Sequence, residues 1–215
     1  MNWPAPTYHD IEQNSDEWLK LRAGRLTSSN IGKVMANYPK AFGEPAKKLA
    51  YQIAVERLTG KPAGDGYSNA HTERGHEQEP LARMAYEDQF FCSVENGGFF
   101  DCGVVGCSPD GLVDDGLIEI KSVIASQHFI NINRQKFDPV YKWQKFGNML
   151  ITGREWLDFI SYCADFPTEK KLYVYRIYAK DYQEEFEAMK KRIDQFLTLV
   201  DSSMETIETA RYCIL

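Results

Sequence analysis

The sequence of 215 residues lacks the features that mark membrane, secreted or disulfide-rich proteins. No apolar run approaches the roughly 18 residues of a membrane-spanning helix. The first residues carry neither a basic region nor an apolar core of a signal peptide, so we expect a protein that is not secreted. The five cysteines include no C-x-x-C pair, which disfavours a disulfide framework or a thiolate zinc site and fits reduced thiols in a cytoplasm. No repeat or linker-like segment divides the chain, and a single domain over residues 1–215 is expected.

Positive charge is also scarce. The 25 Lys and Arg residues against 31 Asp and Glu give a net charge of −6, which excludes a generally basic nucleic-acid coat. Net charge describes the whole surface, however, and leaves room for a local basic channel or an acidic metal site. Aromatic residues are plentiful (12 Tyr, 12 Phe and 4 Trp), which argues against disorder.

Helical patterns flank a central group of short apolar strands. Helices are predicted from residue 14 or 15 to 21, from 28 or 29 to 35, and at 45–59, 77–90, after 124, 139–151 and 186–207. Strands are predicted at 94–100, 103–107, 117–123, 156–163 and 172–178, with a hairpin turn at Asp115-Gly116. The fold class is therefore predicted as α/β (α+β), a central mixed β-sheet flanked by helices.

The segment from Cys107 to Lys121 carries the strongest chemical signal. Asp110 stands at a turn that enters the predicted hairpin, and Glu119 and Lys121 are two residues apart on the returning strand. Residues two apart on a strand share a face, and the hairpin returns Asp110 beside Glu119. Two carboxylates and an ammonium would then converge at one sheet edge. The simpler alternative is an ordinary hairpin with a solvated Asp and a surface Glu-Lys pair.

Such oxygen ligands suit Mg²⁺ or Mn²⁺ and phosphodiester chemistry. Metal ions held by Asp110 and Glu119, with the backbone carbonyl of Ile120 as an extra ligand, can neutralise charge and supply hydroxide. Lys121 can hold or deprotonate the attacking water and stabilise the pentavalent state.

The pattern of P-D, a spacer and E-x-K resembles the PD-(D/E)xK nuclease superfamily. Three further segments resemble the phage lambda exonuclease-like alkaline exonuclease branch, and all four blocks match in order and spacing over roughly residues 14–180. These segments are residues 18–29 (WLKLRAGRLTSS), 74–82 (RGHEQEPLA) and 141–144 (YKWQ).

This resemblance implies a restriction-endonuclease-like core and a Mg²⁺-dependent enzyme, with Mn²⁺ as a substitute and two ions in each active site. It implies 5′→3′ degradation of one strand of duplex DNA from 5′-phosphorylated ends, which leaves 3′ overhangs for a single-strand annealing recombinase. It further implies a homotrimeric ring in the cytoplasm of a bacterial cell, encoded by a phage or prophage. Trp3, Trp156 and the final helix offer apolar surface for such a ring.

The resemblance also implies roles for individual residues. Glu79 would join Asp110 and Glu119 in the metal site, with Lys121 as the catalytic lysine and Gln144 near the metal and the water. Three residues would bind the 5′-phosphate: Arg22, Ser29 and Ser108. Each has a simpler interpretation, such as an acidic first helical turn for Glu79 or a stem covering apolar surface for Arg22, and Arg25 is the alternative phosphate ligand.

One departure concerns strand separation. The family places an apolar wedge before its G-x-x-x-E block, whereas residues 69–73 here include no large aliphatic side chain. Either His71 or Tyr67 takes that role, or strand separation is less assisted. His71 and His76 are otherwise expected to be surface groups. Two other functions remain open, an endonuclease of the same superfamily and a DNA-end-binding module without catalysis.

Overall fold

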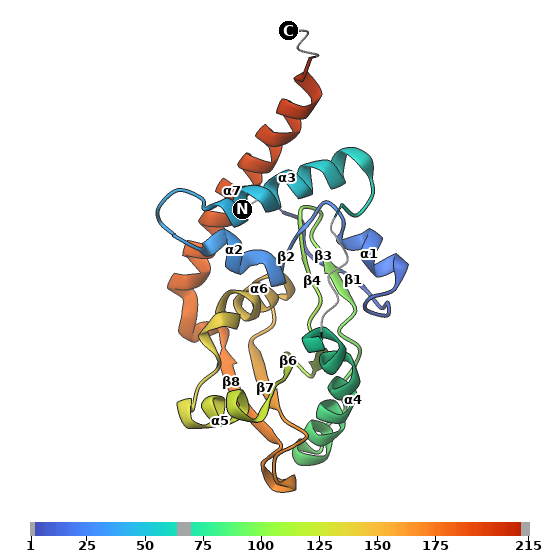
Figure 1. Ribbon diagram of the computed structural model, residues 1–215, viewed down its shortest axis with the longest axis vertical. Coiled ribbons are helices and arrows are strands. Elements are labelled where there is room, and N and C mark those ends of the chain that lie inside the picture. The colour runs from blue at the N-terminus through green and yellow to red at the C-terminus, as the bar shows by residue number, and fades with distance from the viewer. Residues whose placement is uncertain (1–2, 64–69, 212–215) are drawn as a thin grey trace.

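The computed structural model describes residues 3–63 and 70–211. Two four-stranded mixed sheets lie among the helices (Figure 1). No helix in the described part is long and apolar enough to cross a membrane. The helices are α1 (Asp16–Arg22), α2 (Ile31–Met35), α3 (Glu44–Thr59), α4 (Ala70–Phe90), α5 (Ala125–Arg134), α6 (Lys142–Thr152) and α7 (Gln183–Thr209), with short 3-10 turns η1 (Ser28–Asn30), η2 (Pro139–Tyr141), η3 (Thr168–Lys170) and η4 (Ala179–Tyr182).

The first sheet has the order β1-β3-β4-β2 and the second β5-β6-β7-β8. In each sheet one neighbouring pair is parallel, β2 with β4 and β6 with β7, and the other pairs are antiparallel. The strands are β1 (Thr7–His9), β2 (Leu26–Thr27), β3 (Phe99–Asp101), β4 (Val105–Cys107), β5 (Gly111–Val113), β6 (Gly116–Ser122), β7 (Trp156–Tyr162) and β8 (Leu172–Tyr178).

Alternation along β6 divides the core between the two faces of the second sheet. Ile118 and Ile120 pack with Ala82 and Tyr86 of α4, whereas Leu117 belongs to the larger core that includes residues of α2, α3, α6 and α7. Since side chains alternate along a strand, Glu119 and Lys121 lie on the same side as Leu117, the side that α6 covers. The alternation therefore brings the predicted catalytic side chains under α6.

The predicted fold class is confirmed, although the structure forms two mixed sheets where one was expected. The β5–β6 hairpin forms as predicted, and the cap of α1 is Ser15, whose Oγ accepts from Trp18 N at 3.2 Å. Three predicted boundaries are wrong. Neither Ser28 nor Ser29 caps a helix, because a 3-10 turn precedes α2. Helix α4 begins at residue 70, and only residues 99 and 100 of the segment 94–100 belong to a named strand, β3.

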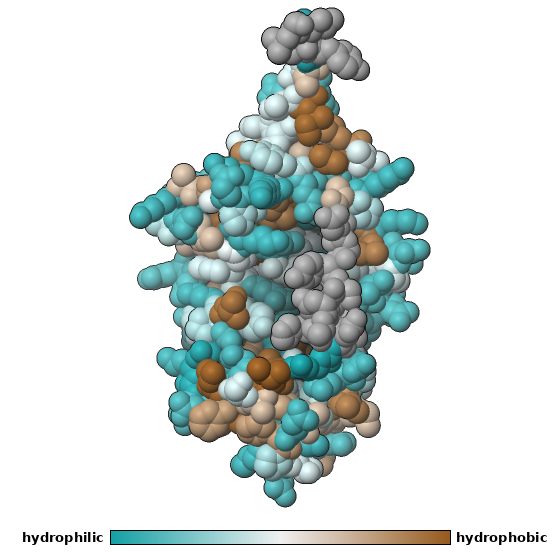
Figure 2. Space-filling view, viewed as in Figure 1, coloured by the Kyte–Doolittle hydropathy of each residue, from teal (hydrophilic) through white to brown (hydrophobic). Residues whose placement is uncertain are grey.

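The aromatic surface expected for assembly is largely covered. Trp156 packs against Gly116, where a Cβ would lie 2.1 Å from the indole ring, and the Arg176 guanidinium lies 3.7 Å from the ring centroid. Trp3 packs against the core. Apolar side chains do gather on the projecting end of α7, the part that includes the half-exposed Ile207 (Figure 2).

Gly147 allows α6 to approach η1 and α2 closely. A Cβ at this position would lie 2.5 Å from Ile31 Cδ1 and 3.1 Å from Ser28 Cβ, and Ile31 is fully buried. We expect Gly147→Ala to lower the free energy of unfolding by about 1–3 kcal/mol, because overpacking outweighs the gain in helix propensity. Gly32→Ala is the matched control, since nothing lies within 4 Å of a Cβ there. Urea denaturation measures both, and equal stability of the two variants would contradict the close packing.

Candidate active site

Glu119 lies at the centre of the candidate site, on the inner strand β6, with its side chain fully buried. Its Oε1 accepts hydrogen bonds from Lys121 Nζ and Gln144 Nε2, each at 2.5 Å, and its Oε2 accepts from Asn148 Nδ2 at 2.8 Å. A buried carboxylate needs such donors to offset its lost hydration. The structure thus brings Glu119, Lys121 and Gln144 together, in agreement with the sequence-based hypothesis.

Asn148 is a site residue that the sequence analysis missed. It stands one helical turn after Gln144, and both amides reach the same carboxylate from α6. Residues four apart on a helix share a face, so this spacing could have indicated Asn148 once Gln144 was chosen. Its Oδ1 is buried and has no hydrogen-bond partner among the described residues.

Asp110 lies in the connection from β4 to β5, directly before the β5–β6 hairpin, where the sequence predicted it. Its Oδ2 accepts from the Ile120 amide at 2.6 Å, which holds the carboxylate beside the strand that carries Glu119. Burial and the nearby charges of Glu119 and Glu79 raise the pKa of Asp110 well above its usual range, and Lys121 offsets only part of this effect. Two crowded carboxylates of this kind fit a divalent cation, since a cation would relieve their repulsion.

Lys121 remains an ammonium in this environment. Burial alone would lower the pKa of Lys121, but the charges of Glu119 and Asp110 raise it above its ordinary value. Its Nζ also lies 5.0 Å from the centroid of the Tyr141 ring. A protonated lysine can hold a water or stabilise developing negative charge, and these two options fit better than proton abstraction.

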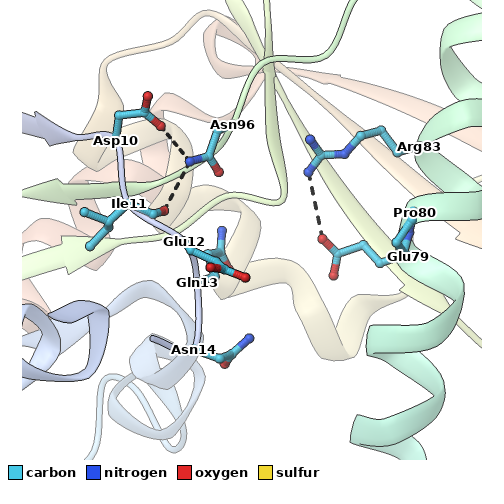
Figure 3. Close-up of a pocket in the computed structure, with 9 residues that line it drawn as sticks. All are labelled: Asp10, Ile11, Glu12, Gln13, Asn14, Glu79, Pro80, Arg83 and Asn96. Atoms are coloured by element: carbon cyan, nitrogen blue, oxygen red, sulfur yellow. Dashed lines mark hydrogen bonds and ion pairs between the residues drawn. The ribbon is translucent and has the colours of Figure 1, made fainter. Parts of the chain in front are cut away.

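Glu79 contributes to the site from a greater distance. It is 37% exposed, lies 4.0 Å from Arg83 Nη2, and lines a pocket of about 460 Å³ between α4 and residues 10–14 (Figure 3). Within residues 3–63 and 70–211, no three His, Cys, Asp or Glu side chains are grouped closely enough to hold a metal ion. The structure therefore pairs Asp110 with Glu119 but does not complete the predicted three-carboxylate set.

The three predicted phosphate-binding residues gather around Trp18. The indole Nε1 donates to Ser108 Oγ at 2.8 Å, and the Arg22 guanidinium stacks 4.0 Å from the indole centroid. Arg22 Nη2 lies 3.5 Å from Ser29 Oγ. Because β2 runs parallel to β4, the chain leaves both strands at the same end, which brings Ser29 and Ser108 together. Trp18, part of the family motif, is the contact that joins them.

Arg22 has the character of an anion-binding residue. Burial lowers the pKa of Arg22 to about 10, and no carboxylate forms an ion pair with it in the described part of the chain. A desolvated guanidinium beside hydroxyl groups favours a bound anion. Arg25, the alternative, is committed to Asp101 through two bonds of 2.7 Å. Of the two candidate wedge residues, Tyr67 lies outside the described residues, as do the side chains of His71 and His76.

The sequence analysis also missed a second lysine, Lys145, which lies near Glu119 and Lys121. The Lys145 side chain is fully buried among the rings of Phe137, Tyr141 and Phe159, whose centroids are 4.3–5.3 Å from Nζ. Its Nζ donates to the backbone carbonyl of Asp138 at 3.3 Å. Burial lowers the pKa of Lys145 to about 7, an effect that the charge of Glu119 only partly offsets.

The fold and these side chains define a nuclease of the alkaline exonuclease type. The YqaJ-like viral recombinase domain matches residues 17–155, more than half of the chain, and the chain belongs to this family. The lambda exonuclease-like family expected from the sequence is thereby confirmed, together with its enzyme class, a metal-dependent deoxyribonuclease.

Solved structures agree with this assignment. An alkaline exonuclease from Laribacter hongkongensis is 31% identical with a TM-score of 0.80, over 90% of this chain and 96% of that one, and its complex with dAMP matches equally well. A phage-related exonuclease from Haemophilus somnus 129PT shares the fold, with a TM-score of 0.70 at 15% identity, over 85% of this chain and 96% of that one. No curated protein matches the chain.

The buried lysine predicts a pH dependence of stability. The folded pKa of Lys145 near 7 lies below the value of about 10.4 expected in the unfolded chain. Between these values the unfolded chain binds more protons, so rising pH favours folding. We expect the stability of the wild type relative to Lys145→Met to increase from pH 7 to 10 in urea titrations with EDTA. Lys136→Met, at an exposed position, is the control, and a difference independent of pH would contradict the prediction.

Proposed function

We propose that the chain is a Mg²⁺-dependent 5′→3′ exonuclease that degrades one strand of linear duplex DNA from 5′-phosphorylated ends. One observation carries the proposal. Asp110, which lies beside Glu119 and the Lys121 ammonium, is two residues along the chain from Ser108, which belongs to the Arg22 cluster. A hydrolytic centre beside an anion site is what cleavage near a phosphorylated end requires.

The donor atoms at this centre fit Mg²⁺, with Mn²⁺ as a substitute. Asp110, Glu119 and the carbonyl of Ile120 would hold it, Glu79 would complete the set, and two ions in each site are proposed. A bound ion would neutralise charge on the phosphate and lower the pKa of a coordinated water. Lys121 would hold the attacking water or stabilise the charge that develops on the phosphate oxygens.

Gln144 and Asn148 would act on this centre through Glu119. Both amides donate to the carboxylate, one to each oxygen, and so fix the direction in which its remaining electron pairs point. Gln144 also approaches the side of Glu119 that Lys121 occupies, since both donate to Oε1. We therefore place Gln144 near the attacking water and assign Asn148 a positioning role.

The Arg22 cluster supplies a reason for cutting at ends. A terminal phosphate monoester carries up to two negative charges, whereas an internal diester carries one. The planar guanidinium of Arg22 can bind such a group through two hydrogen bonds, with hydroxyl groups of Ser29 and Ser108 as further donors. Binding of the end would then place the adjacent linkage at the metal centre.

The biological setting that we propose is the one expected for the family. A 5′→3′ exonuclease leaves 3′ single-stranded overhangs, the substrate of a single-strand annealing recombinase, which we propose as the partner. We further propose a homotrimeric ring around the DNA and a place in the cytoplasm of a bacterial cell, where a phage or prophage would encode the protein. The apolar end of α7 is the surface that supports assembly.

Digestion of linear and closed circular duplex DNA, each with Mg²⁺ and with EDTA, tests the proposal. We expect loss of linear DNA only, and only with Mg²⁺. Cleavage of circles would instead indicate an endonuclease of the same superfamily. Binding of ends without degradation would indicate a module that does not cleave.

End recognition gives a sharper prediction at Arg22. Wild-type protein should digest 5′-phosphorylated duplex faster than 5′-hydroxyl duplex, and Arg22→Ala should remove that preference. Charge-assisted contacts contribute about 1.5–3 kcal/mol, so the ratio should change roughly tenfold to a hundredfold. Arg22→Lys should restore it only in part, because the planar fork is lost.

The control for this measurement is Lys20→Ala, an exposed basic residue on the same helix. It should keep the wild-type ratio between the two kinds of end. A wild-type ratio in Arg22→Ala would place the phosphate pocket elsewhere.

A further inference from the structure

Arg83 contacts two elements of the candidate metal site at once. It stands one turn after Glu79 on α4, and its Nη2 donates to the backbone carbonyl of Asp110 at 2.6 Å. The same nitrogen lies 4.0 Å from Glu79 Oε1, and Figure 3 shows the two side chains directed toward one another at the pocket. None of the roles described above uses this arginine.

The opposite wall of the pocket holds the neighbouring peptide. Gln13 Nε2 donates to the carbonyl of Pro109 at 2.8 Å. The backbone of Gly97 also packs against this peptide, because a Cβ there would lie 1.8 Å from the Pro109 oxygen. Gln13 and Gly97 thus hold the main chain at Pro109, and Arg83 holds it at Asp110.

The remaining packing of α4 fixes the distance between Glu79 and Asp110 less directly. Ala82 and Tyr86 pack on Ile118 and Ile120, and apolar contact of this kind is not directional. Tyr86 donates to Asp158 at 2.7 Å, on β7 rather than near Asp110. Among the contacts of the described residues, Arg83 supplies a directional link between the helix turn that carries Glu79 and the loop that carries Asp110.

We infer that Arg83 is a positioning residue that sets the span between Glu79 and Asp110, so that both can reach one cation. The inference rests on the proposed function, which makes these two side chains metal ligands. Residues that orient metal ligands in this way commonly change metal affinity when they are replaced.

A competing effect has the opposite sign. Removing the positive charge of Arg83 would reduce repulsion of a cation and so favour its binding. That charge is 29% exposed, and its contact with Glu79 is long, so solvent screens it strongly. The short bond to the Asp110 carbonyl is charge-assisted and partly buried, and such bonds are about twice as strong as neutral ones. Loss of positioning should therefore dominate.

Calorimetry of Mn²⁺ binding to the full chain without DNA tests the inference. We expect Arg83→Gln to raise the dissociation constant about tenfold or more. Arg83→Lys, which keeps the charge and a donor, should have a smaller effect. Met84→Gln is the matched control at the adjacent position, where the side chain is 60% exposed, and it should bind as the wild type does. Melting temperatures of all variants separate lost affinity from lost folding.

Unchanged or tighter Mn²⁺ binding by Arg83→Gln would overturn the inference. If Asp110→Asn abolishes binding in the same series, that result leaves the proposed metal centre intact. A wild-type chain that binds no Mn²⁺ would overturn both proposals. Should Arg83→Gln fail to fold, Arg83→Lys decides: a weakened affinity would support the inference, and wild-type affinity would overturn it.

Discussion

The buried carboxylate of Glu119 constrains the elements around the site. Its two oxygens accept from three side chains, and removing a donor would leave charge buried without compensation, which typically costs several kcal/mol. Lys121 must therefore extend along β6 toward Glu119, and α6 must present Gln144 and Asn148 on one face. The orientation of α6 over the second sheet is thus coupled to the chemistry of one residue.

The same helix links the proposed metal centre to the proposed anion site. Gly147 of α6 lies against Ser28 and Ile31, so the turn that carries Ser29 packs beside the helix that carries Gln144. From the other direction, Trp18 joins Arg22 to Ser108, two residues before Asp110. Two independent packing contacts therefore fix the anion site relative to the carboxylates, although α1 and β6 are far apart in the sequence.

Local signals predicted the centre of the site better than its surroundings. The alternation of Glu119 and Lys121 and the hairpin at Asp110 depend on strand period and turn residues, which the sequence displays directly. Lys145 and Arg83 depend on how helices pack across the sheet, and no local pattern distinguishes them from solvated residues. The two short strands β1 and β2 were missed because two or three residues show no periodicity, and their long-range pairing makes a second sheet out of the one expected.

The charges at the site support the proposal that it binds a divalent cation. Asp110 and Glu119 stand against a single firmly protonated Lys121, and Lys145 can lose its proton near neutral pH because burial lowers its pKa. Burial and, after it, the charge of Glu119 raise the pKa of Asp110 and so favour its protonated form, which leaves Glu119 balanced by Lys121. A cation that displaces the proton from Asp110 gains two charged ligands, so metal binding should be coupled to proton release and strengthen as the pH rises. The incomplete ligand set and the crowded carboxylates are then two aspects of one arrangement, in which binding of the ion supplies the missing positive charge.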